Sequence, residues 1–94
     1  MKNLTMDQVL AIFAFRTRMI VCDGNYKKGM YIQVCPWCNN HPDTQELLFT
    51  CDHLRKIMKI EGSYVDIFSN HIEPNLARTL RNIWIYRKEN RKYV

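Results

Sequence analysis

The chain has 94 residues and carries 14 Lys and Arg against nine Asp and Glu, which gives a net charge of +5. Its length predicts a single domain, residues 1–94, with a core small enough for a bound metal to matter to its stability. Asp7, Arg16 and Arg18 interrupt the apolar stretches of the N-terminal segment, which excludes a secretion signal and a membrane span there. We therefore expect an intracellular protein, nuclear or cytoplasmic, with reduced thiols and no membrane association.

The first predicted helix covers about residues 6–20. Thr5 and Gln8 are placed as the two members of a capping box at its start. Turn-forming residues follow within 23–29. The alternating residues 30–34 then predict a short strand that leads into the first cysteine.

The second predicted helix covers about residues 44–60. Asp43 stands as its N-cap, with Glu46 three residues later, and Gly62 follows as a residue that can close a helix. The pair Cys35 and Cys38 precedes this helix and is expected on a tight turn.

Two further helical segments complete the chain. Ser63 is placed to cap one or two turns over residues 64–69. Pro74 fits the first turn of a last helix over residues 75–91. The sequence therefore predicts a mainly α fold, a small helical domain with a short β or zinc-knuckle element at residues 31–53.

Three cysteines carry the spacing of an incomplete zinc site. Cys35 and Cys38 form a C-x2-C pair, and Cys51 follows on the predicted second helix. The fourth ligand would most naturally lie one turn before Cys51 on the same helical face. That position is Leu47, which cannot bind zinc.

The segment FAFRTRMIVCDGNYKKGMYIQVCPWCNNHPDTQELLFTCDHL resembles the C-terminal zinc-finger segment that follows the reverse transcriptase in Jockey-like non-LTR retrotransposon polyproteins. The resemblance extends more weakly through YVDIFSNHIEPNLARTLRNIWIYRKE to the helical end of those polyproteins. The matching residues are Arg16, Arg18, Met19, Asn25, Tyr26, Cys35, Pro36, Cys38, Asp43, Thr44, Gln45, Glu46, Leu48 and Cys51. The resemblance implies that this chain is a zinc-finger module derived from such a protein. A stand-alone fragment that the host has retained is one form of such a module. The family's ligand histidine is replaced here by Leu47.

Three outcomes remain open for the fourth ligand. His53 lies two residues after Cys51, about 200° around a helix, so an intact helix aims it poorly. His41 lies in the loop after the C-x2-C pair, where its geometry is freer, and Cys22 is a further candidate thiol. In the third outcome zinc is lost, and Leu47 packs into the space beside cysteines that remain as small buried apolar residues.

The positive charge is concentrated near the C-terminus. Residues 1–73 carry equal numbers of acidic and basic side chains, so the whole excess follows residue 73. This pattern favours a polyanionic partner, RNA more than DNA. A solvent-exposed helix face without such a partner would carry the same charge pattern. Eight cations and one ring that stands between two cysteines are the predicted nucleic-acid contacts: Arg16, Arg18, Arg78, Arg81, Arg87, Lys88, Arg91, Lys92 and Trp37.

The sequence offers no motif for catalysis, neither a metalloprotease helix nor a phosphate-binding loop, so we expect no enzymatic activity. The alternative to nucleic-acid binding is a small protein-interaction module that has lost or altered its metal site, with a homodimer as one of its forms. Apolar residues left over from the two long helices would then form the contact surface: Ile12, Phe15, Ile85 and Tyr86.

Overall fold

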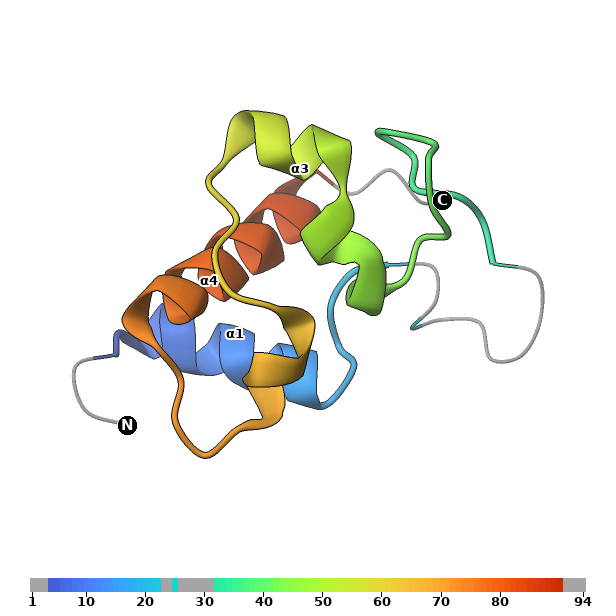
Figure 1. Ribbon diagram of the computed structural model, residues 1–94. Coiled ribbons are helices and arrows are strands. Elements are labelled where there is room, and N and C mark those ends of the chain that lie inside the picture. The colour runs from blue at the N-terminus through green and yellow to red at the C-terminus, as the bar shows by residue number, and fades with distance from the viewer. Residues whose placement is uncertain (1–3, 23–24, 26–31, 91–94) are drawn as a thin grey trace.

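A computed structural model describes residues 4–22, 25 and 32–90 of the chain (Figure 1). Three α-helices and two 3₁₀ helices follow one another in this part of the chain: α1 (Met6–Arg16), η1 (Gln45–Thr50), α3 (Asp52–Ile57), η2 (Tyr64–Phe68) and α4 (Pro74–Glu89). The predicted mainly α class is confirmed. No helix in the described part is long and apolar enough to cross a membrane.

The core lies between α1 and α4, which run side by side (Figure 1). Apolar side chains from every helix join one buried cluster: Ala11, Ile12, Ala14, Phe15, Ile20, Cys35, Leu48, Phe49, Cys51, Leu54, Ile67, Ile72, Leu76, Ala77, Leu80 and Ile83. Two of the three cysteines singled out above, Cys35 and Cys51, belong to this cluster. The segment that carries these two cysteines therefore packs in the same core as the long helices.

The capping box predicted at the start of α1 is present. The Gln8 backbone N–H donates to Thr5 Oγ1, and the Thr5 backbone N–H donates to Gln8 Oε1, each at 3.1 Å. Two of the orphan N–H groups at the helix start are thereby satisfied, which fixes where α1 begins.

The end of α1 comes earlier than predicted, at Arg16 rather than residue 20. Arg18 adopts a left-handed backbone with φ of 59°, and the Met19 N–H then donates to the Ala14 carbonyl at 2.8 Å. This is the hydrogen-bond pattern of a Schellman motif, which stops a helix by reversing the chain. An Arg stands at the position that most often holds Gly, so the sequence pattern did not reveal the stop.

The predicted continuous helix over residues 44–60 is broken in two. Cys51 lies between η1 and α3 with an extended backbone, φ −69° and ψ 120°. Asp43 as the N-cap was also wrong: Thr44 holds that position and makes no capping bond with its side chain. The buried Asp43 carboxylate instead pairs with Arg87.

The predicted strand is reduced to one bridge in the described residues, between Val34 and Pro42. Residues 30–31 of that prediction lie outside the described part. Two backbone bonds continue the pairing, from Cys35 N–H to the His41 carbonyl at 2.9 Å and from Asp43 N–H to the Gln33 carbonyl at 2.8 Å. The chain therefore forms a short hairpin-like loop that carries the cysteine pair at its tip.

The last two elements follow the sequence prediction closely. The 3₁₀ helix η2 ends at Phe68, and α4 starts with Pro74 in its first turn. Gly62 precedes η2 with φ of 84°, and a Cβ atom there would lie 2.9 Å from Leu76 Cδ1. Only glycine allows both this backbone conformation and this close approach to α4.

Candidate metal centre

The turn at Cys35 and Cys38 aims both thiols to one side. Pro36 restricts the backbone after the first cysteine. Asn39, directly after the second, has a positive φ of 58°, and its N–H donates to the Cys35 carbonyl at 2.9 Å. Asn tolerates this left-handed conformation better than most residues, so the local sequence favours the tight turn.

The third cysteine completes a triangle of sulfur atoms. Cys51 Sγ lies 3.8 Å from Cys35 Sγ and 3.7 Å from Cys38 Sγ. A tetrahedral zinc ion with sulfur ligands at about 2.3 Å requires sulfurs about 3.8 Å apart. The extended backbone at Cys51, which breaks the predicted helix, is what brings this thiol to the other two.

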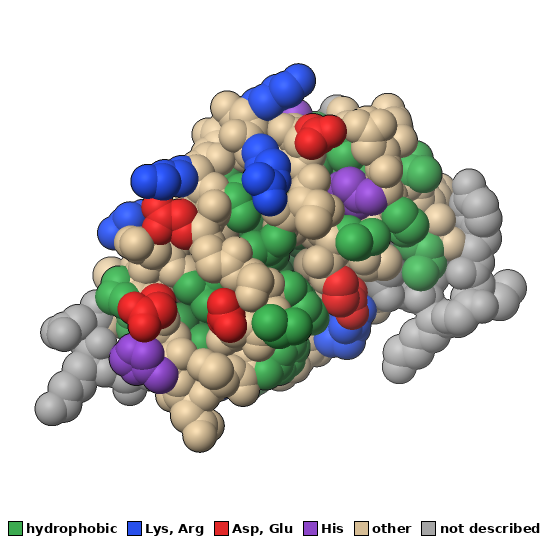
Figure 2. All heavy atoms as spheres, in the orientation of Figure 1, with side chains coloured by type: hydrophobic (Ala, Val, Ile, Leu, Met, Phe, Trp, Pro, Cys, Tyr) green, Lys and Arg blue, Asp and Glu red, His purple; other side chains and the backbone are tan. Residues whose placement is uncertain are grey.

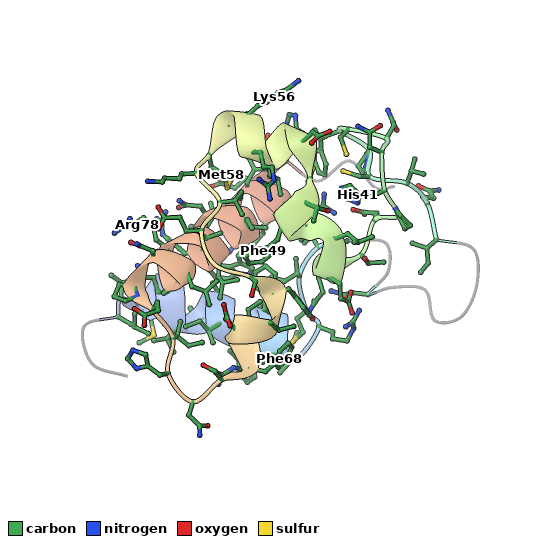
Figure 3. The ribbon with its side chains drawn as sticks, viewed as in Figure 1. His41, Phe49, Lys56, Met58, Phe68 and Arg78 are labelled. Atoms are coloured by element: carbon green, nitrogen blue, oxygen red, sulfur yellow. The ribbon has the colours of Figure 1, made fainter. Side chains whose placement is uncertain are left out.

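His41 supplies a fourth donor atom beside the sulfurs. One ligand atom from each of Cys35, Cys38, His41 and Cys51 can be chosen so that all four lie within 4.8 Å of one another. His41 comes from the same loop (Figure 3). Three sulfurs and one imidazole nitrogen are a donor set that structural zinc sites use.

The ring of His41 is oriented for binding. Its Nδ1 lies 2.7 Å from the Pro42 carbonyl oxygen, so Nδ1–H is the donor, and in the neutral ring Nε2 then carries the lone pair. The Nε2 atom is buried and has no hydrogen-bond partner. Ligand histidines commonly donate their other ring N–H to a carbonyl in this way, whereas a buried nitrogen without a partner is otherwise costly.

The other candidate ligands lie outside this group. His53 Nε2 is 2.7 Å from the Tyr86 hydroxyl, and its ring stacks on Trp37 with centroids 6.0 Å apart. Cys22 is buried and, like His53, does not belong to the group of possible ligands. Leu47 stays half-buried on η1. Of the candidate fourth ligands, the loop histidine is therefore the one that lies with the three thiols.

The thiols of the group differ in acidity. Burial raises the pKa of Cys51 to about 12. Burial also acts to raise the pKa of Cys38, but the Asn40 backbone N–H and the neighbouring thiols of Cys51 and Cys35 outweigh it and leave this pKa below its ordinary value. A cation is the partner that would stabilise all three sulfurs as thiolates.

A buried ion pair joins the loop to α4. Arg87 Nη2 donates to Asp43 Oδ1 at 2.6 Å, and Arg87 Nε donates to the Val21 carbonyl at 2.8 Å. The guanidinium carbon lies 4.5 Å from the centroid of the Trp37 ring. Trp37 stands between the two cysteines of the turn, so the loop is fastened to α4 by charge, hydrogen bonds and ring contact together.

Several cations predicted to contact nucleic acid form hydrogen bonds or ion pairs with other groups of the protein. Arg16 donates to the Ile67 and Ser69 carbonyls at 2.8 and 2.9 Å. Arg18 pairs with Glu46 at 2.7 Å, which lowers the pKa of that carboxyl. The remaining paired cations are Arg81, 3.8 Å from Asp7, and the buried Arg87.

The other members of that predicted set are placed differently. Arg78 and Lys88 are exposed on α4, with Lys88 Nζ 4.2 Å from the centroid of the Trp84 ring. Arg91 and Lys92 lie outside the described residues. Three exposed cations near α3 are absent from the predicted set: Arg55, Lys56 and Lys59. Basic and acidic side chains are equal in number over residues 1–73, so the charge pattern gave no reason to include them. Figure 2 shows Lys and Arg side chains on the face of the molecule that α3 and α4 form.

Comparisons with models of known protein families, with curated proteins and with solved structures find no match to this chain.

Proposed function

We propose that this chain is a non-enzymatic interaction module in which one structural zinc ion is held by Cys35, Cys38, His41 and Cys51. The observation that carries the proposal is the triangle of sulfurs with the unpartnered Nε2 atom of His41 beside it. Four protein donors leave no open position on a tetrahedral ion for a substrate or a reactive water, which supports a structural rather than catalytic role.

Zinc would contribute much of the stability of so small a fold. Structural zinc binding is worth on the order of 10 kcal/mol in small finger peptides, comparable with the whole net stability of many domains. The resemblance to the segment after the reverse transcriptase in Jockey-like polyproteins supports an origin in such an element. His41 would then replace the histidine that the family places at residue 47.

The zinc proposal predicts a metal count that depends on one histidine. Native mass spectrometry of the purified chain should show one zinc ion per chain, which a strong chelator removes. His41→Ala should lose zinc under conditions in which His53→Ala and the exposed His71→Ala keep it. Zinc retained by His41→Ala and lost by His53→Ala would contradict the assignment, and a wild-type chain that never binds zinc would contradict the proposal.

A protein partner is favoured by the apolar side chains left exposed. Met6 and Phe13 lie seven residues apart on the outward face of α1 and are 72% and 59% exposed. Val65 and Phe68 of η2 are 73% and 53% exposed. Exposed apolar groups that form one patch are typical of surfaces that bind another protein, and α1 and η2 are in contact with each other. Ile12 and Phe15, which the sequence suggested for this surface, are buried in the core.

Nucleic-acid binding is the second candidate, supported by the net charge of +5 and by exposed cations such as Arg78 and Lys88. Binding of a single-stranded RNA oligonucleotide should then weaken with salt. The double variant Arg78→Gln with Lys88→Gln should reduce the slope of log K against log salt by about 1–2. An unchanged slope, with wild-type folding, would count against this candidate.

A further inference from the structure

A groove of about 430 Å³ lies between the end of α3 and the outward face of α4. Its apolar lining comes from Ile57 and Met58 on one side and from Ile85 and Tyr86 on the other. Ile57 is 47% exposed, which is high for a side chain of its size and apolar character. The groove is therefore an apolar surface that the rest of the described chain does not cover.

The sequence of α4 explains why its outward face is available. The buried residues Leu76, Leu80 and Ile83 point toward α1 and the core. Asn82 and Ile85 stand three residues apart on the opposite face, where they line the groove. The segment of this chain that faces α4 across the groove is short. It is short because α3 ends at Ile57 and Met58 continues with an extended backbone, φ −153° and ψ 158°.

Positive charge borders this groove. Lys56 directly precedes Ile57, and Lys59 directly follows Met58. Arg78 stands one turn before Asn82 on α4, and Arg81 lines the groove itself. Figure 3 shows Met58 between Lys56 and Arg78, and Figure 2 shows basic side chains over this part of the surface.

Acidic groups near the groove are fewer. Glu89 is the acidic side chain in its lining, Glu61 pairs with Lys59 at 3.1 Å, and Asp7 pairs with Arg81 at 3.8 Å. With Lys59 and Arg81 paired, Lys56 and Arg78 stand against Glu89, so the groove keeps a positive excess that complements a ligand with negative charge around an apolar stripe.

The lining suits aliphatic side chains better than nucleic-acid bases. Single-stranded nucleic acid needs free aromatic faces on which its bases stack. Tyr86 packs against Trp37 with centroids 5.8 Å apart, and its hydroxyl contacts His53. The ring of Trp37 is itself stacked on His53 and contacted by Arg87.

We infer that this groove binds an acidic amphipathic helix from a partner protein. Apolar side chains of that helix, at i, i+3 or i+4 and i+7, would lie on Ile57, Met58 and Ile85, while its Asp and Glu residues face the bordering cations. The inference rests on the proposed role as an interaction module and specifies the partner's chemistry.

A synthetic peptide of about four helical turns, with Leu on one face and Glu on the other, is the probe. Its binding to the zinc-loaded full chain is measured by fluorescence anisotropy, and NMR shift changes locate it. We expect binding that tightens as salt is lowered, with shifts confined to α3 and α4. Ile57→Asp should weaken binding about tenfold, whereas Met19→Asp, which adds the same charge at an exposed position outside the groove, should not.

A charge-reversed variant tests whether weaker peptide binding could be caused by loss of the fold. Lys56→Glu with Arg78→Glu changes only exposed side chains and should shift preference from the Glu peptide to its Lys counterpart. Equal binding of a shuffled Glu peptide, or RNA binding without peptide binding, would overturn the inference. Retention of zinc in the same samples would show that the inference alone had failed and not the metal assignment.

Discussion

Arg87 is fully buried, and its role is to hold parts of the chain together that are distant in sequence. Its guanidinium binds the Asp43 carboxylate and the Val21 carbonyl and lies against Trp37. A charge without water needs these partners, because an uncompensated buried ion is strongly destabilising. A side chain that charge patterning assigns to the solvent thus becomes part of the interior.

Arg87→Ala should be among the most damaging single substitutions in the chain. It leaves Asp43 buried and unpaired, which should lower the free energy of unfolding by about 3–5 kcal/mol. Urea denaturation measures the change, and Arg78→Ala on the same helix, whose side chain is exposed, should cost no more than about 0.5 kcal/mol. The double variant Arg87→Met with Asp43→Leu should recover part of the loss, since it removes both charges. A loss below about 1 kcal/mol in Arg87→Ala would show that the pair does not hold the loop to α4.

The helices of this fold depend on specific residues at their ends, and three of them, η1, α3 and η2, are no longer than six residues. Thr5 and Gln8 fix the start of α1, and Arg18 in its left-handed conformation fixes the end. Cys51 separates η1 from α3. Each of these ends turns the chain so that an apolar face meets the core, and helices of this length gain most of their stability from that packing.

Gly62→Ala tests the segment that connects α3 to η2. The backbone at Gly62 has φ of 84°, and the new Cβ would lie 2.9 Å from Leu76 Cδ1. We expect a loss of about 1–3 kcal/mol in thermal or chemical unfolding, because strain and crowding act together. Ser63→Ala, at the next and exposed position, should change stability by only about 0.5 kcal/mol. Equal effects of the two substitutions would show that the segment relaxes to accept the side chain.

The parts of the fold that the sequence predicted are those governed by local chemistry. The capping box at Thr5, the proline start of α4 and the mainly α class depend on residues close together in the chain. The break at Cys51 depends on partners 13 and 16 residues away, Cys38 and Cys35, which periodicity does not register.

The candidate metal ligands show the same division between what local sequence predicts and what only the fold determines. The C-x2-C spacing and the later Cys51 identified three donors, whereas choosing between His41 and His53 required the turn of the loop and the contact of His53 with Tyr86. Burial of the predicted phosphate contact Arg87 could not be read from charge, because its partner Asp43 lies 44 residues away. Tertiary contacts of this kind are set by the fold as a whole.

The whole molecule combines a loop that carries candidate metal ligands with a pair of packed helices. The loop and the helices share one core. Cys35 and Cys51 are buried in the same cluster as residues of α1 and α4. The pair between Asp43 and Arg87 adds a polar link. The groove between α3 and α4 lies beside this link, since Tyr86, the neighbour of Arg87, lines it. Order in the loop and the shape of the groove therefore depend on common residues.

The close spacing of three donors, Cys35, Cys38 and His41, also bears on the order in which the chain assembles. Bringing them together closes only a very short loop, which costs little chain entropy. If these residues hold the proposed zinc ion, a nascent chain could bind it through this segment before α4 has been synthesised. Cys51 would then require one further, longer loop closure, after which the long C-terminal helix would pack on a segment that the ion already holds together.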